Sequence, residues 1–369
     1  MPMSWIKSDN AKDILIVIVF SLVLLLLVDY FLGYTILHNA PIRTRNNAER
    51  GLGISHPIYH HTLATNYNGL ASFDQKTEHR FCTNDAGFKS NCNAINNIKN
   101  YDIAFLGDSF TEGVGLPYEK TFVGLIAEQL PKKKIANLAV SSYAPSIYYL
   151  KLVDLLNKGY TFKELVVFID ISDIQDESNY AIIHGKVVDT IKNTSKQQIF
   201  PLINFGLKGL KSRFLSVSNS GPHVASLDLN DEIYSKEYRR SAWTIDESDD
   251  GFGEIGLKGS IEKSVRLMEK IYAVCKKNNI KLSVGVYPWP GQILYDVEES
   301  KQVKIWREFC TNKCTNFYNS FPTFFDLVRA SNKNDVISKY YYYGDQHFND
   351  DGNQLIASDF LSTYQQRTH

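Results

Sequence analysis

From Tyr101 to the C-terminus, short apolar runs alternate with amphipathic stretches of helical spacing. The runs predicted as strands are Ile103–Leu106, Lys134–Val140, Glu164–Ile171, Lys281–Tyr287 and one within Asn316–Asp326. The stretches predicted as helices are Thr121–Leu130, Ile147–Lys158, Ser260–Asn278, Val303–Cys310, Leu327–Ser331 and Asn353–Gln366. Strands with continuous apolar centres are typical of a parallel sheet covered on both faces. The alternation therefore predicts an α/β fold with a doubly wound, mainly parallel sheet and right-handed crossovers.

The segment Tyr101–Gly115 places one serine at the end of the first predicted strand. Its apolar run ends in Gly107-Asp108-Ser109, and a glycine-spaced turn follows. Open α/β sheets bind ligands outside the carboxyl ends of their strands, which is where this serine would lie. A serine becomes a nucleophile when a neighbouring base accepts its proton. We therefore predict that Ser109 is a nucleophile, and the chain must supply its base.

The charge balance argues against nucleic acid as a partner. Lys plus Arg and Asp plus Glu number 40 each, so the formal net charge is zero and no overall field attracts phosphates. The chain has 369 residues, of which 44% are hydrophobic. That length suffices for one large core or two modest domains.

The five cysteines lack the paired knuckles and histidines of a zinc site. We predict no metal and no cofactor. Cys82 and Cys92 bracket a polar loop that suits a disulfide, and Cys310 and Cys314 form a looser candidate pair. Cys275 lies in an apolar helical pattern and is predicted to be buried. Oxidised pairs would place the bulk of the protein in an oxidising compartment. Five reduced thiols are the alternative.

The N-terminal run Ile14–Leu32 is almost wholly apolar and has the length that a membrane helix requires. It lacks the shorter apolar core and small-residue cleavage site of a signal peptide. We predict an uncleaved anchor over residues 14–33, preceded by a short cytoplasmic tail, 1–13. Basic residues flank both sides, so charge leaves the orientation open. The predicted disulfides favour a periplasmic or extracellular body.

After the anchor we predict a loop-rich lead-in over 34–98 and a catalytic domain over 99–369. Residues 176–255 interrupt the alternation and are predicted to be an insertion, with a lid as one role. Within it, Pro201–Leu215 has the pattern of an amphipathic helix. Packing on the body is the simpler interpretation of that helix, and membrane-surface binding is the alternative.

Nine histidines are candidates for the base. His56, His60 and His61 cluster in the lead-in without a nearby carboxylate, and a surface-loop role is favoured over metal binding. His347 lies in a turn-rich stretch just before the last predicted helix, two residues after Asp345. A carboxylate at that spacing can reach the histidine Nδ1 and fix its tautomer. His347 is therefore the predicted base, and Asp345 its orienting acid.

Together, IAFLGDSFTEGVG and DQHFNDDG resemble the first and last motifs of the SGNH, or GDSL-type, hydrolase superfamily. The resemblance runs from about Tyr101 to the C-terminus. It implies a flavodoxin-like three-layer fold and the triad Ser109, His347 and Asp345. Many members carry Asp three residues before the histidine, where this chain has Gly344. Some polysaccharide-modifying members show the D-x-H form found here.

The family's oxyanion hole combines the N–H of the serine, an N–H from a second block and an Asn side chain from a third. By resemblance these donors fall on Ser109, Ser142 and Ser172. Ser142 stands where glycine is usual, and Ser172 stands where Asn is usual. Ser172 is followed by Asp173, and an ionised Asp173 could not donate to an oxyanion. Asp108 and Asp173 are candidate substrate contacts.

The resemblance to membrane-tethered members implies a serine esterase or acyltransferase that acts on O-acetyl groups of cell-surface carbohydrate. Hydrolysis and acyl transfer stay open, because both proceed through one acyl-enzyme. The altered third block motivates the alternative of a weakly active or inactive scaffold in glycan assembly. A lipid esterase is a third alternative. Aromatic residues could stack on sugars or pack in the core, and core or rim packing is favoured for most: Tyr143, Tyr148, Tyr149, Trp289 and Tyr341–Tyr343.

Overall fold

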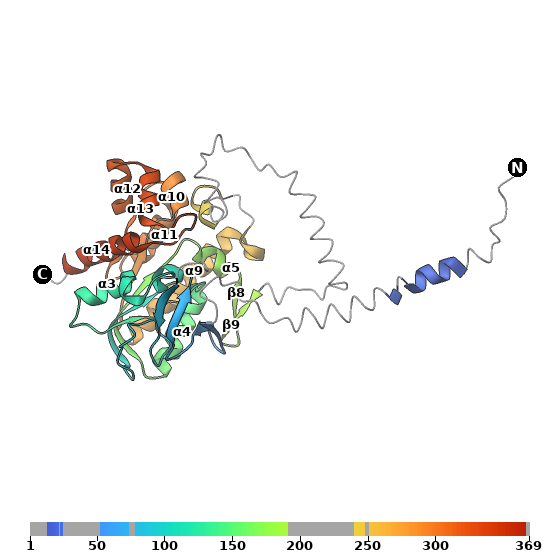
Figure 1. Ribbon diagram of the computed structural model, residues 1–369, viewed down its shortest axis with the longest axis horizontal. Coiled ribbons are helices and arrows are strands. Elements are labelled where there is room, and N and C mark those ends of the chain that lie inside the picture. The colour runs from blue at the N-terminus through green and yellow to red at the C-terminus, as the bar shows by residue number, and fades with distance from the viewer. Residues whose placement is uncertain are drawn as a thin grey trace. The chain divides into compact units, whose positions relative to one another are not determined.

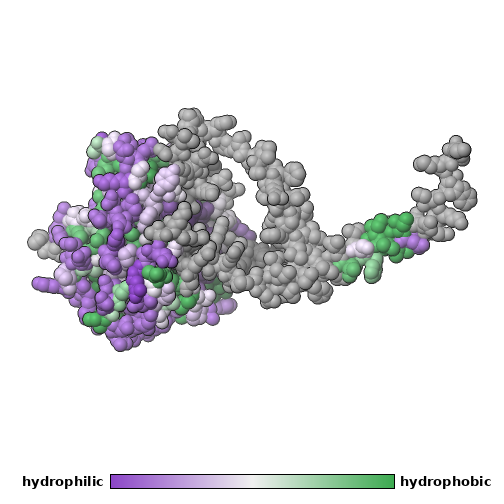
Figure 2. Space-filling view, viewed as in Figure 1, coloured by the Kyte–Doolittle hydropathy of each residue, from purple (hydrophilic) through white to green (hydrophobic). Residues whose placement is uncertain are grey.

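The computed structural model describes residues 13–21, 23–24, 52–73, 78–190, 240–247 and 251–366. The first two ranges are helical, and their large apolar side chains are exposed and appear green in Figure 2. Across the described ranges, no helix is both long enough and apolar enough to cross a membrane. The rest of the predicted anchor, residue 22 and residues 25–33, falls outside these ranges. The anchor therefore stays a prediction.

A five-stranded parallel sheet forms the centre of the α/β body (Figure 1). In spatial order its strands are β6 (Ile135–Asn137), β5 (Asn100–Leu106), β7 (Thr161–Phe168), β10 (Lys281–Val286) and β11 (Phe317–Asn319). Numbered along the chain, this is the order 2-1-3-4-5 of flavodoxin-like folds. The apolar centres of the inner strands are fully buried. The prediction of a doubly wound parallel sheet is confirmed.

Helices cover both faces of the sheet. The main ones are α3 (Phe122–Gln129), α4 (Pro145–Asn157), α9 (Gly256–Lys277), α11 (Lys301–Cys310) and α14 (Asp350–Gln366). Helix α3 packs on α14, and α4 packs on α9. Because the step from β5 to β6 runs opposite to the later steps, right-handed crossovers put these two pairs on opposite faces. Asn353 of α14 accepts a hydrogen bond from the N–H of Phe122, which ties the last helix to the first strand–helix unit.

The described part of the lead-in forms two antiparallel hairpins. They are β1 (Gly53–His56) with β2 (His60–Leu63), and β3 (Asn68–Ser72) with β4 (Glu78–Cys82). The polar composition predicts a loop-rich segment here, but the apolar side chains of Leu52, Tyr59 and Leu63 join the core of the body. The hairpins escaped prediction because polar and histidine residues dilute their short apolar alternation.

The predicted insertion lies in the crossover between β7 and β10. Its described part contains α5 (Asp173–Ser178), the hairpin β8 (Tyr180–Ile183) and β9 (Lys186–Asp189), and two short 3-10 turns at Ala242–Thr244 and Gly253–Ile255. The predicted helix Pro201–Leu215 lies outside the described residues.

Three helices differ from expectation in the C-terminal third. They are α10 (Pro290–Tyr295), α12 (Phe321–Ala330) and α13 (Lys333–Tyr340). The first and last were not predicted, and α12 begins at Phe321 rather than Leu327. Pro290 lies in the first turn of α10, where a helix needs no N–H donor.

The structure contains both predicted disulfides, Cys82–Cys92 and Cys310–Cys314. Cys275 is free and buried in α9, as predicted. The first disulfide links the end of β4 to the loop that leads into the central sheet. The compartment that these bonds imply stays a prediction.

Candidate active site

The turn after β5 exposes the serine by a tight backbone path. Asp108 caps α2 (Ser109–Glu112), because its Oδ1 accepts a hydrogen bond of 3.0 Å from the N–H of Phe110. A β-carbon on Gly107 would come within 2.1 Å of the Thr111 hydroxyl, so glycine is required there. Gly113 then ends the helix in the left-handed conformation. Strand, cap and short helix together hold Ser109 at the carboxyl end of β5.

Residues from opposite ends of the domain meet at this serine. The Oγ of Ser109 lies 2.8 Å from Nε2 of His347, and Nδ1 of His347 lies 2.5 Å from Oδ1 of Asp345. These residues form a Ser-His-Asp triad. The carboxylate accepts from Nδ1–H, so Nε2 is left to accept the serine proton. His347 is 8% exposed, which shields that proton transfer from bulk water.

The Asp345 carboxylate is fixed by its own loop. Its Oδ1 also accepts the backbone N–H of His347 at 2.8 Å. Burial raises the pKa of Asp345, but the charge and hydrogen bonds of His347 outweigh burial and hold that pKa below its ordinary value. Asp345 therefore stays ionised beside the imidazole. Gly344 adopts a φ of 74°, a left-handed conformation that favours glycine where many SGNH sequences carry the acid.

Asn349 and Gly352, at the end of the last motif, fix the conformation of the loop. The Asn349 side chain donates to the carbonyls of Lys339 and Tyr341 and accepts the N–H of Gly352. A β-carbon on Gly352 would come within 2.1 Å of the Tyr340 carbonyl. These contacts clamp the loop that carries His347 onto the start of α14.

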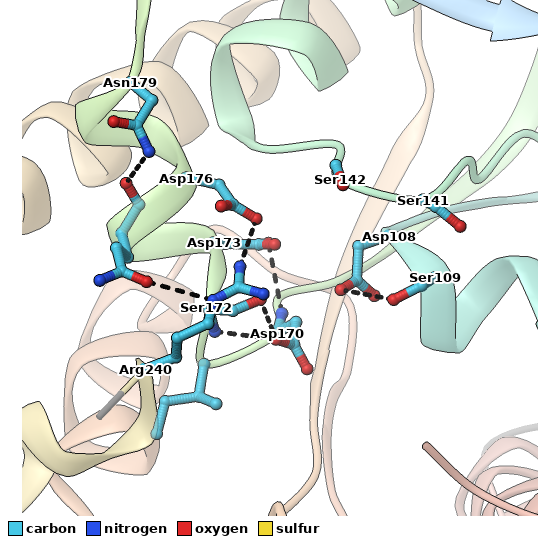
Figure 3. A network of polar contacts seen from close by, with 12 residues as sticks. Asp108, Ser109, Ser141, Ser142, Asp170, Ser172, Asp173, Asp176, Asn179 and Arg240 are labelled. Atoms are coloured by element: carbon cyan, nitrogen blue, oxygen red, sulfur yellow. Dashed lines mark hydrogen bonds and ion pairs between the residues drawn. The ribbon is translucent and has the colours of Figure 1, made fainter. Parts of the chain in front are cut away.

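The second predicted block lies against the nucleophile helix (Figure 3). Glu112 of α2 accepts both the N–H and the hydroxyl of Ser141, at 2.6 and 3.0 Å. The next residue, Ser142, has a φ of 63°, so it holds the left-handed conformation that glycine takes more easily. The structure thus holds the second block against α2, and the role of Ser142 as an oxyanion donor stays a proposal.

The third predicted block follows β7, the strand beside β5. Ser172 donates both its N–H and its hydroxyl to Oδ1 of Asp170, at 2.8 and 2.6 Å (Figure 3). The other Asp170 oxygen accepts the indole N–H of Trp289 at 2.6 Å. The Ser172 hydroxyl is therefore directed at Asp170. An oxyanion would compete with that carboxylate for the same proton.

Three buried carboxyl groups lie close to the serine. Asp108, Asp170 and Asp173 each place one oxygen within 4.8 Å of the others. Burial and neighbouring carboxylates raise the pKa of Asp108 and of Asp173 well above the ordinary value. Burial also raises the pKa of Asp170, but hydrogen bonds from Ser172 and Trp289 oppose the shift. Protons on Asp108 and Asp173 would therefore relieve the repulsion and leave the charge on Asp170, which accepts hydrogen bonds from Ser172 and Trp289.

Asp173 has the environment of a neutral acid. Its Oδ2 accepts the Tyr148 hydroxyl at 2.9 Å and the N–H of Asp170 at 3.2 Å. Its Oδ1 is buried and has no hydrogen-bond partner among the described residues. A proton on Oδ1 would make Asp173 a donor, which an ionised side chain could not be. Full burial makes Asp173 a weaker candidate for direct substrate contact.

Most of the aromatic residues singled out in the sequence are core residues. Tyr143, Tyr148, Trp289 and Tyr341 are buried, as favoured above. Tyr343 differs, because it is 85% exposed and lies two residues before Asp345. It is the side chain of this group best placed to meet a substrate at the surface.

One histidine of the lead-in lies closer to the site than its sequence context predicts. His61 is buried, and its Nε2 lies 2.8 Å from the carbonyl oxygen of Ser141. The expectation of a surface loop is therefore wrong for His61. The carboxylate missing nearby in the sequence is supplied from β9, where Asp189 lies 3.1 Å from Nε2 of His60. The sequence of β2, HHTL, carries no alternation that signals this, because His61, Thr62 and Leu63 are all buried.

No protein-family model and no curated protein matches this chain. It is similar to the solved structure of a lipolytic G-D-S-L family protein from Veillonella parvula, with 11% identity, 72% of this chain and 98% of that one covered, and a TM-score of 0.39. An acetylxylan esterase from Geobacillus stearothermophilus has 8% identity, 71% and 93% coverage, and a TM-score of 0.39. A psychrotrophic esterase from Pseudoalteromonas sp. has 12% identity, with 73% of this chain and 99% of that one covered, and a TM-score of 0.37. Because these TM-scores are low, function rests on the geometry of the site.

Proposed function

We propose that this chain is a membrane-anchored serine esterase or acyltransferase of the SGNH type. The observation that carries the proposal is the continuous chain of contacts from Ser109 Oγ through His347 to Asp345, at 2.8 and 2.5 Å. Structural packing does not require an ionised acid, a histidine of fixed tautomer and a serine in this order. The order is that of an activated nucleophile.

In the proposed reaction, Ser109 Oγ attacks the ester carbonyl carbon while its proton passes to Nε2 of His347. The tetrahedral oxyanion then collapses, the alkoxide leaves with that proton, and Ser109 carries the acyl group. Water or a sugar hydroxyl next loses its proton to His347 and attacks the acyl-enzyme, which returns Ser109 to its starting state. Asp345 stabilises the imidazolium that forms in both steps.

The carbohydrate assignment is the finer part of the proposal. The D-x-H form of the last motif and the predicted anchor favour O-acetyl groups on cell-surface glycan. The exposed ring of Tyr343 near Asp345 could stack on a sugar. The anchor is supported by the apolar character of residues 14–33 and by the exposed apolar side chains of its described part. We propose that the body is periplasmic or extracellular.

The test uses the purified full-length chain in detergent with p-nitrophenyl acetate. Hydrolysis by the wild type should exceed that by Ser109→Ala by at least 10³-fold, because loss of the nucleophile removes the acyl-enzyme route. Equal, slow rates for both proteins would favour the scaffold alternative. Comparing acetyl with decanoyl esters separates a glycan esterase from a lipid esterase. Adding a sugar acceptor then distinguishes transfer from hydrolysis by the product formed.

A further inference from the structure

The peptide group that joins Ser141 to Ser142 connects the lead-in to the site. A trans peptide is planar, so its C=O and its N–H point in opposite directions. The described residues contain no cis peptide bond. Nε2 of His61 lies 2.8 Å from the carbonyl oxygen of Ser141. His61 therefore holds one end of the same rigid group whose other end is the N–H of Ser142.

The ring of His61 is itself fixed in one tautomer. A carbonyl oxygen can only accept, so Nε2 of His61 carries the hydrogen. Burial lowers the pKa of His61 to about 4, so the ring is neutral at pH 7 and Nδ1 is an acceptor. Nδ1 of His60 lies 2.8 Å away and must therefore be the donor. Nε2 of His60 lies 3.1 Å from Oδ1 of Asp189, a contact that is favourable when Nε2 also carries a hydrogen. The chain of contacts Asp189–His60–His61 thus directs an N–H toward Ser141.

The peptide needs such a hold because its present orientation is strained. Ser142 has a φ of 63°, and a residue with a β-carbon in that region costs about 1–3 kcal/mol. Rotating the peptide group would relieve that strain and reverse the direction of the Ser142 N–H. The groups on either side are fixed, because Glu112 accepts the N–H of Ser141 and the Tyr180 hydroxyl donates to the carbonyl of Ser142. The bond from His61 to the Ser141 carbonyl opposes rotation of the peptide between these two fixed groups.

We propose that His61 is a positioning residue of the esterase: its Nε2–H holds the Ser141–Ser142 peptide so that the Ser142 N–H faces the oxyanion formed at Ser109. This inference rests on the proposed function. Hydrogen bonding to the carbonyl also polarises the peptide and strengthens its N–H as a donor. The lead-in is then part of the catalytic body, although it precedes the strand that carries the nucleophile.

The test compares His61→Met with His61→Gln in the full-length protein. The two side chains are of similar size and flexibility, but only Gln can donate to Ser141. His61→Met should lower kcat for p-nitrophenyl acetate by about 10²-fold, the effect of losing one oxyanion donor, with KM within about threefold of the wild type. His61→Gln should recover at least a tenth of the wild-type kcat. His56→Phe is the matched control, since His56 lies in the same hairpin and stacks on Tyr59.

Adding Ser142→Gly supplies a second readout. Glycine tolerates the left-handed conformation, so it weakens the drive for rotation and should raise the kcat of His61→Met by about fivefold or more. If His61→Met alone does not fold, the Met–Gln comparison is made in the Ser142→Gly background. A kcat for His61→Met within threefold of the wild type, a change confined to KM, or a Gln variant as slow as Met would overturn the inference alone. A wild type without Ser109-dependent hydrolysis would overturn the esterase proposal and this inference with it.

Discussion

Replacing Asp345 by Asn tests whether the negative charge of Asp345 stabilises the imidazolium of His347. Oδ1 of Asp345 accepts two hydrogen bonds, from Nδ1 and from the backbone N–H of His347. An Asn side chain can accept both hydrogen bonds when its amide oxygen takes the place of Oδ1. The flipped orientation is unfavourable, because its NH₂ group would then face the backbone N–H. We therefore expect Asp345→Asn to retain the histidine tautomer and to lose only the negative charge.

The size of that loss follows from the geometry. With charge centres about 4 Å apart and an effective dielectric constant of about 20, the carboxylate stabilises the imidazolium by about 4 kcal/mol. At 1.36 kcal/mol per factor of ten, this corresponds to about 10³-fold in rate. The Asp345 side chain is 32% exposed, so water screens part of the interaction. The expected fall in kcat/KM is therefore about 10²–10³-fold.

The assay is kcat/KM for p-nitrophenyl acetate at pH 8, with Ser109→Ala as the background. A fall of less than about tenfold would refute the claim that Asp345 stabilises the imidazolium. A fall to the Ser109→Ala background would instead show that the tautomer is lost, since imposing the wrong tautomer costs about 10⁴-fold in a well-studied triad. Thermal unfolding of the variant checks that the loop has not collapsed.

Three further predictions concern buried groups. Asp173→Asn should keep the fold and gain stability relative to the wild type as pH rises from 4 to 8. The reason is the raised pKa of Asp173, which makes the folded wild type hold a proton that the unfolded state releases. The same difference in melting temperature between variant and wild type at pH 4 and pH 8 would contradict this. Burial lowers the pKa of Lys151 to about 7, so between pH 7 and 10 the unfolded state binds more protons than the folded state, and wild-type stability should rise with pH. In urea unfolding, Lys151→Met should show a smaller rise in unfolding free energy over that range. The same rise in variant and wild type would contradict the prediction. Thiol counting on the unfolded, non-reduced protein should find one free thiol, Cys275, and five would refute both disulfides.

Much of the fold was predictable because the strands of the central sheet have recognisable patterns in the local sequence. The buried strands carry continuous apolar runs, and β7 and β10 lie within one to three residues of their predicted ends. The long helices α4, α9 and α14 show clear periodicity and were also predicted. Short elements were not: α13 has few buried side chains and depends on its Asn332 cap, a weak local signal.

The candidate triad was predictable for a different reason. Ser109 sits in a glycine-spaced turn after a strand, and His347 follows Asp345 in a turn before a helix, so each half carries its own local pattern. The surrounding donors carry none. Glu112 reads as an ordinary helix residue, and nothing local shows that its carboxylate accepts two bonds from Ser141.

The sequence by itself determined the α/β alternation, the nucleophile turn, the D-x-H loop and the apolar N-terminal run, because each depends on residues that are neighbours along the chain. Only the tertiary structure decided how the site is completed. The strand order brings the ends of β5 and β7 together and so gathers Asp108, Asp170 and Asp173. Folding also buries His61 against Ser141, 80 residues away. Local sequence patterns do not show such contacts between distant segments. Their burial and hydrogen bonds form only when the sheet, hairpins and insertion pack together.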